Sequence, residues 1–293
     1  MKIFIYLPNW LGDAIMAAGA INALIKKFPN AKITFYGSFI ACEIYKNLGE
    51  IIVEKKGERL KQIKNLKQEF DLGISFKASI SSKVLLFMLK AKKKFYFNAN
   101  KSDNTHQVLK YFNLLKELNL DDNLNTQIPY KKLKTKKLLG IAAGAKYGAA
   151  KCYEPSYFAQ IASTFKDHKI ILFGTKNESD ICNIIEEELK KYNIKAINLC
   201  GKTDIKKLCL AVSSLDYLLA NDSGIMHLGA SYNVNVLAFF GPTNIYQTYP
   251  YCKNGKLFSL KLPCSPCAKR VCPLKHHKCM KDLIPEIVLK ELR

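Results

Sequence analysis

The chain has 293 residues, of which 48% are hydrophobic, enough for about two packed cores. Its net charge of +22, from 46 Lys and Arg against 24 Asp and Glu, predicts attraction to nucleic acid, an anionic membrane surface or a phosphorylated glycolipid. No RNA-binding signature or basic heptad region accompanies these residues, which disfavours nucleic acid. No apolar run reaches the ~18 residues of a membrane-spanning helix. A strand, in place of a signal peptide, follows Met1, so we expect a cytoplasmic protein.

The first part of the chain alternates between short apolar strands and amphipathic helices. We predict strands at 2–7, 32–36, 51–54, 72–76 and 95–97, and helices at 14–27, 39–48, 58–70, 79–89 and 106–118. Such alternation is typical of a parallel sheet with helices on both faces. The first strand leads into its helix without GxGxxG, which argues against a nicotinamide or flavin site. Asp13, at or just before that helix, either caps it or serves chemistry at the carboxyl end of the strand.

A polar segment at 119–137, with a lysine run and one proline, is predicted to link two domains. The second alternating set has strands at 138–142, 169–173, 196–199, 216–220 and 235–240, and helices at 155–165, 178–191, 204–212 and 225–232. We expect residues 263–281 to be irregular and 285–292 to form a last helix. The prediction is an α/β protein with two doubly wound domains, 1–130 and 131–282, followed by a C-terminal helical segment, 283–293.

The stretch 221–242, NDSGIMHLGASYNVNVLAFFGP, joins two predicted strands through a polar turn and a helix. Asp222 or Ser223 can cap that helix, and Gly224 lets the backbone approach a ligand. A helix start just past the carboxyl end of a parallel strand suits an anion such as a pyrophosphate. His227 is expected near the same place. The alternative, an ordinary N-cap with His227 as a core histidine, fits the local pattern equally well.

Two further loops leave the carboxyl ends of neighbouring strands. The first, GIAAGAKYGAAKCY at 140–153, combines small residues that let the backbone approach phosphate oxygens with Lys151, which can add a point charge. It is not a Walker motif, because the GK[ST] ending is absent. The second, FGTKNE at 173–178, follows the next strand. Convergence of these loops with the 221–224 turn predicts a nucleotide site.

Several segments together resemble the ADP-heptose:lipopolysaccharide heptosyltransferases, glycosyltransferase family 9. They are NWLGDAIMA at 9–17, GAKYGAAKCY at 144–153, NDSGIMHLGAS at 221–231 and FGPT at 240–243. The tail CSPCAKRVCPLKHHKC at 264–279 is similar to the type II enzymes, heptosyltransferase II. The resemblance runs from Met1 to the last helix. It implies a GT-B fold, in which two Rossmann-like domains face a cleft, the first binding the acceptor and the second ADP-heptose. It also implies inverting chemistry with no metal or other cofactor, and the sequence contains no DxD triplet.

The resemblance assigns roles to the matching residues. Asp13, the aspartate of the LGD segment, is expected to take the proton of the acceptor hydroxyl, and Lys151 to stabilise the departing diphosphate. Acceptor binding is expected at Asn9 and Gly12. Donor binding is expected at Lys146, Tyr147, Gly174, Thr175, Asp222, Ser223, Gly224, Ile225 and His227. Cys152 and Tyr153 depart from the Arg-Trp that usually follows the motif lysine in type II enzymes, which puts local packing in question.

The implied reaction moves L-glycero-D-manno-heptose from ADP-heptose to the heptosyl-Kdo-lipid A inner core of lipopolysaccharide. It would occur on the inner face of the inner membrane, where a basic protein meets Kdo carboxylates, lipid phosphates and anionic headgroups. One alternative is heptosyltransferase I, or a related enzyme that uses another sugar nucleotide. Another, of a different class, is a non-catalytic module that binds a nucleotide sugar or nucleic acid.

The ten cysteines fall into two groups. Six are scattered, mostly among apolar neighbours, as expected for reduced core residues. The other four, Cys264, Cys267, Cys272 and Cys279, follow the pattern C-x2-C-x4-C-x6-C, a spacing that four thiolates could use on zinc. Iron-sulfur binding is less favoured because the surroundings are highly polar. Packing or free thiols in a surface tail is an equally open interpretation.

Overall fold

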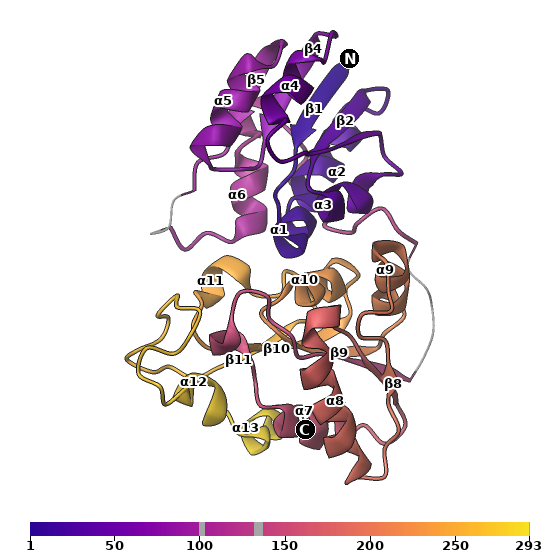
Figure 1. Ribbon diagram of the computed structural model, residues 1–293, viewed down its shortest axis with the longest axis vertical. Coiled ribbons are helices and arrows are strands. Elements are labelled where there is room, and N and C mark those ends of the chain that lie inside the picture. The colour runs from indigo at the N-terminus through magenta and orange to yellow at the C-terminus, as the bar shows by residue number, and fades with distance from the viewer. Residues whose placement is uncertain (100–102, 132–136, 293) are drawn as a thin grey trace. The chain divides into compact units, whose positions relative to one another are not determined.

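The computed structural model describes residues 1–99, 103–131 and 137–292. The chain divides into two compact units, Met1–Pro129 and Tyr130–Arg293, next to the predicted boundary (Figure 1). Part of the predicted linker, 132–136, lies outside the described residues. Each unit holds its own parallel sheet with helices packed around it, so the predicted fold class of two doubly wound α/β domains is confirmed. None of the helices in the described ranges is both long and apolar enough to span a bilayer.

The first sheet has the strand order β3-β2-β1-β4-β5, and all its strands run parallel. The strands are β1 (Lys2–Tyr6), β2 (Lys32–Gly37), β3 (Glu50–Val53), β4 (Phe70–Ser75) and β5 (Ala91–Tyr96). Neighbours on both sides bury β1, which explains its nearly continuous apolar sequence. The chain order reverses between β1 and β4, and in open parallel sheets ligands bind beyond the carboxyl ends of strands at such a point.

The helices of the first unit differ from the prediction at several ends. They are α1 (Leu11–Met16), α2 (Ala18–Lys27), α3 (Phe39–Tyr45), α4 (Arg59–Lys64), α5 (Ile80–Met88) and α6 (Gln107–Asn113), with a 3-10 turn at Lys116–Leu118. The helix predicted for 14–27 begins earlier, at Leu11, and is interrupted at Ala17. The helix predicted for 58–70 ends at Lys64, because Phe70 is buried and pairs with Ala91 as the first residue of β4. The helix predicted for 106–118 starts after His106, whose side chain caps it.

The second sheet has the order β11-β10-β9-β6-β7-β8, again all parallel. Its strands are β6 (Leu138–Ala142), β7 (Lys169–Leu172), β8 (Ile197–Asn198), β9 (Tyr217–Asn221), β10 (Asn235–Phe240) and β11 (Lys256–Ser259). Numbered within the unit, this is the strand order of a dinucleotide-binding fold, with its reversal between β6 and β9. The nucleotide loops predicted after these two strands therefore leave neighbouring strands at the switch point.

The helices of the second unit extend beyond the predicted set. They are α7 (Pro155–Ser163), α8 (Ser179–Lys190), α9 (Ile205–Ser213), α10 (Gly224–Ser231), α11 (Ile245–Thr248), α12 (Lys278–Lys281) and α13 (Pro285–Lys290). The sequence analysis missed α11 and β11, and the segment predicted to be irregular contains α12. These elements are only four residues long, too short for a periodic pattern.

Tyr153 stacks on Phe239 in the core, with 4.2 Å between ring centroids.

A charged cluster lies buried beyond the carboxyl ends of β1, β3 and β4. The Glu54 carboxylate accepts hydrogen bonds from Lys77 Nζ at 2.6 Å and from the Tyr6 hydroxyl at 2.9 Å, and it also pairs with Arg59. The side chains of Glu54 and Lys77 are 7% and 9% exposed. Burial disfavours the Glu54 charge, but the bonds from Lys77 and Tyr6 and the nearby guanidinium outweigh burial and lower its pKa.

We predict that Glu54→Gln destabilises the protein by about 3–5 kcal/mol at neutral pH, because it leaves Lys77 buried without a counter-charge. Since the folded state lowers the pKa of Glu54, its contribution is present above the unfolded value and is lost as pH falls through the folded value. Denaturant unfolding at neutral and acidic pH measures both effects. The control is Glu187→Gln, which removes an exposed carboxylate paired with Lys190 and should change stability by less than about 1 kcal/mol. Equal effects of the two substitutions would contradict the prediction.

Candidate active site

The helix start that follows β9 carries a hydroxyl group with no partner. Ser223 is the N-cap residue of α10, with extended backbone angles, but its side chain makes no capping hydrogen bond. Within the described ranges its Oγ is buried and has no hydrogen-bond partner. A buried unsatisfied hydroxyl calls for an explanation, and a ligand at a helix amino terminus supplies one, because the first amides there favour an anion.

Ser223 confirms the predicted N-cap position of α10, whereas Asp222 does not cap the helix, and neither side chain makes a capping hydrogen bond. The Asp222 carboxylate accepts a hydrogen bond from Lys151 Nζ at 2.5 Å and another from Thr243 Oγ1 at 2.6 Å. The side chains of Lys151 and Asp222 are only 12% and 6% exposed. Folding therefore joins three motifs that are far apart in sequence, and it places the Lys151 ammonium beside the residue that precedes the Ser223 N-cap.

Asn221, which the sequence analysis did not single out, holds the lysine loop in place. Its side chain is fully buried, donates to the carbonyl of Ala143 and accepts from the Tyr153 N–H at 3.1 Å. One amide at the end of β9 thus ties down both ends of the loop that carries Lys151. The available signal was a polar residue at the end of an otherwise apolar strand.

Tyr147 and Arg270 lie against the same lysine. The ring centroid of Tyr147 is 4.8 Å from Lys151 Nζ and 5.6 Å from the Arg270 guanidinium, and the Tyr147 hydroxyl donates to the Ala268 carbonyl at 2.6 Å. Gly148 is required here, since a Cβ would lie 2.4 Å from the Arg270 carbonyl oxygen and the φ of Gly148 is +155°. Arg270 belongs to the tail. The sequence analysis missed it because it is far from this loop in the sequence and meets it only in the folded chain. Lys146, in the same loop, is exposed.

The predicted loop at 173–178 supports the loop at 140–153. Thr175 forms a capping box with Glu178, whose carboxylate accepts from the Thr175 N–H at 2.7 Å and from its hydroxyl at 2.8 Å. A Cβ on Gly144 would come within 2.0 Å of that carboxylate, and a Cβ on Gly174 would lie 3.0 Å from Cys200 Sγ. Close packing thus accounts for Gly174 and capping for Thr175, and their contact with a donor stays a prediction.

Two predicted donor residues belong to α10 itself. His227 is buried, 5% exposed, and lies one helical turn after Ser223, while Ile225 is half-buried in the first turn beside Gly224. Donor binding by His227 and Ile225 stays a prediction.

The first unit brings the predicted acceptor residues to the start of α1. Trp10 is the N-cap residue of this helix, and Gly12 and Asp13 lie within its first turn, so Asp13 is inside the helix. A carboxylate in the first turn is stabilised by the helix dipole. Burial, together with the charge of Asp13, raises the pKa of Tyr111 in α6. Asn9 is exposed, and its carbonyl accepts from the Ser38 hydroxyl at 3.0 Å.

Comparison with known proteins assigns the chain to a family. Residues 59–278 match the model of glycosyltransferase family 9 (heptosyltransferase). A lipooligosaccharide heptosyltransferase 2 of Campylobacter jejuni is 43% identical, in an alignment that covers all of this chain and 98% of that protein. The chain belongs to glycosyltransferase family 9. It is therefore a glycosyltransferase, and the resemblance of its motifs is confirmed.

Solved structures agree on the fold. The Escherichia coli ADP-heptose LPS heptosyltransferase II has a TM-score of 0.81 at 21% identity, covering 100% of this chain and 97% of that one. The E. coli heptosyltransferase WaaC solved with ADP has a TM-score of 0.76 at 14% identity, covering 100% and 99%. These neighbours support the GT-B fold class that the sequence motifs implied.

In this glycosyltransferase the cysteine-rich tail connects the loop that carries Lys151 to the segment 241–243. The Ala268 N–H donates to the Pro242 carbonyl at 2.7 Å and the Ser265 hydroxyl to the Gly241 carbonyl, next to Thr243. On the other side, His277 Nε2 bonds the Ala150 carbonyl at 2.9 Å, and the Ala150 N–H donates to the Arg270 carbonyl at 3.0 Å. The tail therefore supports both Thr243 and Lys151.

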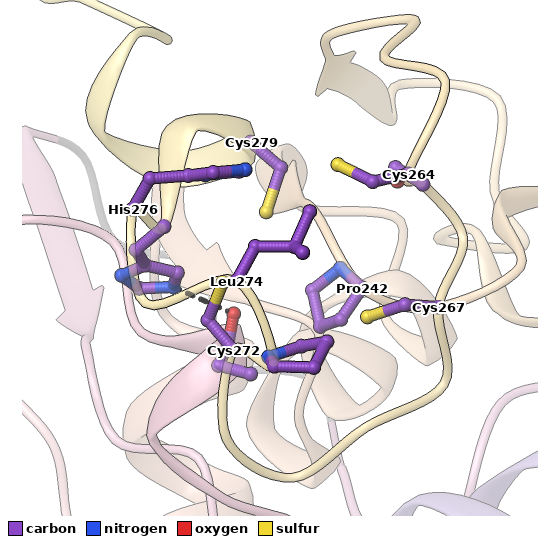
Figure 2. A pocket seen from close by; sticks show the side chains of 11 residues that line it. Pro242, Cys264, Cys267, Cys272, Leu274, His276 and Cys279 are labelled. Carbon is purple, nitrogen blue, oxygen red and sulfur yellow. Dashed lines mark hydrogen bonds between the residues drawn. The ribbon is translucent and has the colours of Figure 1, made fainter.

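The four tail cysteines line a single pocket. Figure 2 shows Cys264, Cys267, Cys272 and Cys279 around this pocket, with Leu274, Pro242 and His276 also in its lining. Burial and the neighbouring thiols raise the pKa of Cys279 to about 11. Among the residues that the structure describes, no group of three or more His, Cys, Asp or Glu is arranged to hold a metal ion. The zinc site stays a prediction from the spacing of the cysteines.

That prediction has a direct test. If the four thiols act as a closed zinc site, purified protein contains about one zinc per chain, and thiol modification releases the metal and lowers the melting temperature. Elemental analysis before and after modification measures this. Metal-free protein that is fully active, and whose melting temperature a chelator leaves unchanged, would show that the cysteines serve only to pack the tail.

Proposed function

We propose that this glycosyltransferase moves L-glycero-D-manno-heptose from ADP-heptose to the heptosyl-Kdo-lipid A inner core, adding the second heptose. The full-length relative at 43% identity carries the name heptosyltransferase 2 and supports this choice over a first-heptose enzyme. The lipid-linked acceptor and the net charge of +22 support peripheral attachment to the inner face of the inner membrane.

The observation that carries the donor assignment is the unpartnered Ser223 hydroxyl at the start of α10, with Lys151 beside it. A diphosphate bound there would accept hydrogen bonds from the Ser223 hydroxyl and from amides in the first turn of α10. An ammonium group has three donors, so Lys151 can keep its bond to Asp222 and still donate to a phosphate oxygen. In this arrangement Asp222 positions Lys151, and Thr243 positions Asp222.

Transfer with inversion requires two contributions from the protein. The acceptor hydroxyl attacks the anomeric carbon as the bond to ADP breaks, and the charge that develops on the diphosphate is stabilised by Lys151 and the α10 amides. The attacking hydroxyl loses its proton, and Asp13 is the base that we propose to accept it. Asp13 thus acts on the acceptor, while Lys151 acts on the leaving group.

The reaction is tested by incubating purified protein with ADP-heptose and either Kdo-lipid A or heptosyl-Kdo-lipid A. We expect mass spectrometry to show one added heptose only on the second acceptor. Product on Kdo-lipid A alone would identify a first-heptose enzyme. Turnover only with another sugar nucleotide would identify a different donor, and tight donor binding without any product would indicate a binding module.

We predict that Asp13→Asn lowers turnover by about 100-fold or more while ADP affinity and melting temperature stay near the wild-type values, because the base acts on the acceptor. Steady-state kinetics and ADP titration measure the two quantities. Asp121→Asn, which alters an exposed aspartate of the same unit, is the control and should keep full turnover. Turnover of the Asp13 variant within about threefold of wild type would leave Asp13 with a purely structural role.

We predict that Lys151→Ala weakens ADP binding by about tenfold or more and also slows transfer, because one charged donor serves both the bound donor and the leaving group. Isothermal titration with ADP and single-turnover kinetics measure these effects. Lys190→Ala removes an exposed lysine of the same unit and should leave both unchanged. An unaltered dissociation constant for ADP in a folded Lys151 variant would place this lysine outside the donor site.

A further inference from the structure

Helix α5 is apolar on both of its faces. Leu85, Leu86 and Leu89 lie buried against the sheet of the first unit. On the other face Ile80, Val84, Phe87 and Met88 are 81%, 47%, 73% and 37% exposed. Spacings of four, seven and eight residues place these four side chains on one side of the helix.

Such a face is unusual on a water-soluble surface. A surface helix normally turns polar side chains to solvent, and exposed clusters of large apolar residues mark sites of interaction with proteins or membranes. The neighbouring strand β5 is the edge strand of its sheet and bears Lys92, Lys93 and Lys94. Lysines on an edge strand oppose pairing with a strand of another protein. The exposed face of α5 is therefore a better candidate for an interaction than the edge of the sheet.

The surroundings of this face are strongly basic. The segment 59–96, which spans α4, α5 and β5, contains ten Lys or Arg and two Asp or Glu. Eight of the ten remain when Arg59 and Lys77, which pair with Glu54, are set aside. Lys94 lies next to the apolar face, with its Nζ 5.5 Å from the Phe87 ring centroid and 2.6 Å from the Phe87 carbonyl oxygen. Lys83 lies on α5 itself, and Lys61 and Lys64 are exposed on α4, which packs beside α5 (Figure 1).

We propose that the exposed face of α5 docks this enzyme on an anionic phospholipid bilayer, with Ile80, Val84, Phe87 and Met88 inserted at the level of the headgroups. A helix with apolar residues on its outer face and lysines around them suits the interface plane, where lysine stems extend along apolar surface and keep their charges in water. A second copy of this chain fits poorly, because two such basic surfaces would repel each other. The choice of a membrane partner rests on the proposed lipid-linked acceptor.

The test measures co-sedimentation with phosphatidylcholine vesicles, with and without phosphatidylglycerol, in the absence of donor and acceptor. We expect wild-type protein to bind the anionic vesicles and to bind pure phosphatidylcholine much more weakly. The double variant Ile80→Ser, Phe87→Ser should reduce binding to anionic vesicles by at least about tenfold. Added salt should weaken binding by the wild-type protein.

The matched control is Ile184→Ser on α8, which removes an aliphatic side chain that is 51% exposed beside Glu186, Glu187 and Glu188. It should bind vesicles like the wild type. Equal loss in the control and the double variant, or binding by the double variant equal to wild type, would overturn the proposal. So would light scattering that shows a wild-type dimer which the double variant abolishes.

Melting temperature and turnover with a soluble, lipid-free acceptor separate this proposal from the proposed function. A folded double variant that keeps turnover on the soluble acceptor but loses vesicle binding supports docking through α5. Vesicle binding through α5 in a protein without heptosyl transfer would reject the proposed function and leave the docking surface standing.

Discussion

The bond between Lys151 and Asp222 is the contact on which the proposed donor site depends. It links the loop after β6 to the turn after β9, and these are the two strands between which the chain order reverses. A buried ion pair contributes little net stability, because desolvation of the two charges offsets their attraction. Its value here is geometric. The carboxylate of Asp222 holds the Lys151 ammonium, and Asp222 directly precedes Ser223, the N-cap residue of α10.

The surrounding structure keeps this pair in place from several sides. Asn221 ties both ends of the lysine loop to β9, Glu178 supports Gly144, and the tail contacts both Ala150 and Gly241. The tail therefore has a structural purpose whether or not its thiols bind a metal. It also explains Gly148, where any side chain would collide with Arg270.

Helices and strands could be predicted from the sequence where neighbouring residues alone determine their boundaries. Strands β6 and β10 were predicted to the residue. Lys137 precedes the apolar run of β6, and Gly241 and Pro242 follow that of β10. The helix predicted for 58–70 failed because Phe70 was assigned by helical spacing, whereas its pairing with Ala91 draws it into β4. At the site, Asp222 or Ser223 was expected to cap α10. Ser223 takes the N-cap position, and the distant partners Lys151 and Thr243 show why the Asp222 carboxylate does not cap. Arg270 could not be identified from its neighbours in the sequence either, because the residues it contacts, Tyr147 and Gly148, are more than a hundred positions away.

Some basic side chains of the first unit neutralise a buried carboxylate, and others lie on its surface. Lys77 and Arg59 neutralise the buried Glu54 and are held inside the first unit, so they contribute little to attraction at long range. Lys61 and Lys64 of α4 are exposed, whereas Lys92 and Lys93 of β5 pair at the surface with Asp71 and Glu117. The field of such surface charges extends about 8 Å at physiological ionic strength. An anionic surface would therefore meet this side of the first unit before any specific contact forms. The groups that we propose to bind the donor lie in the second unit and need no membrane, which makes the proposed donor binding and the proposed surface attachment separable properties of one chain.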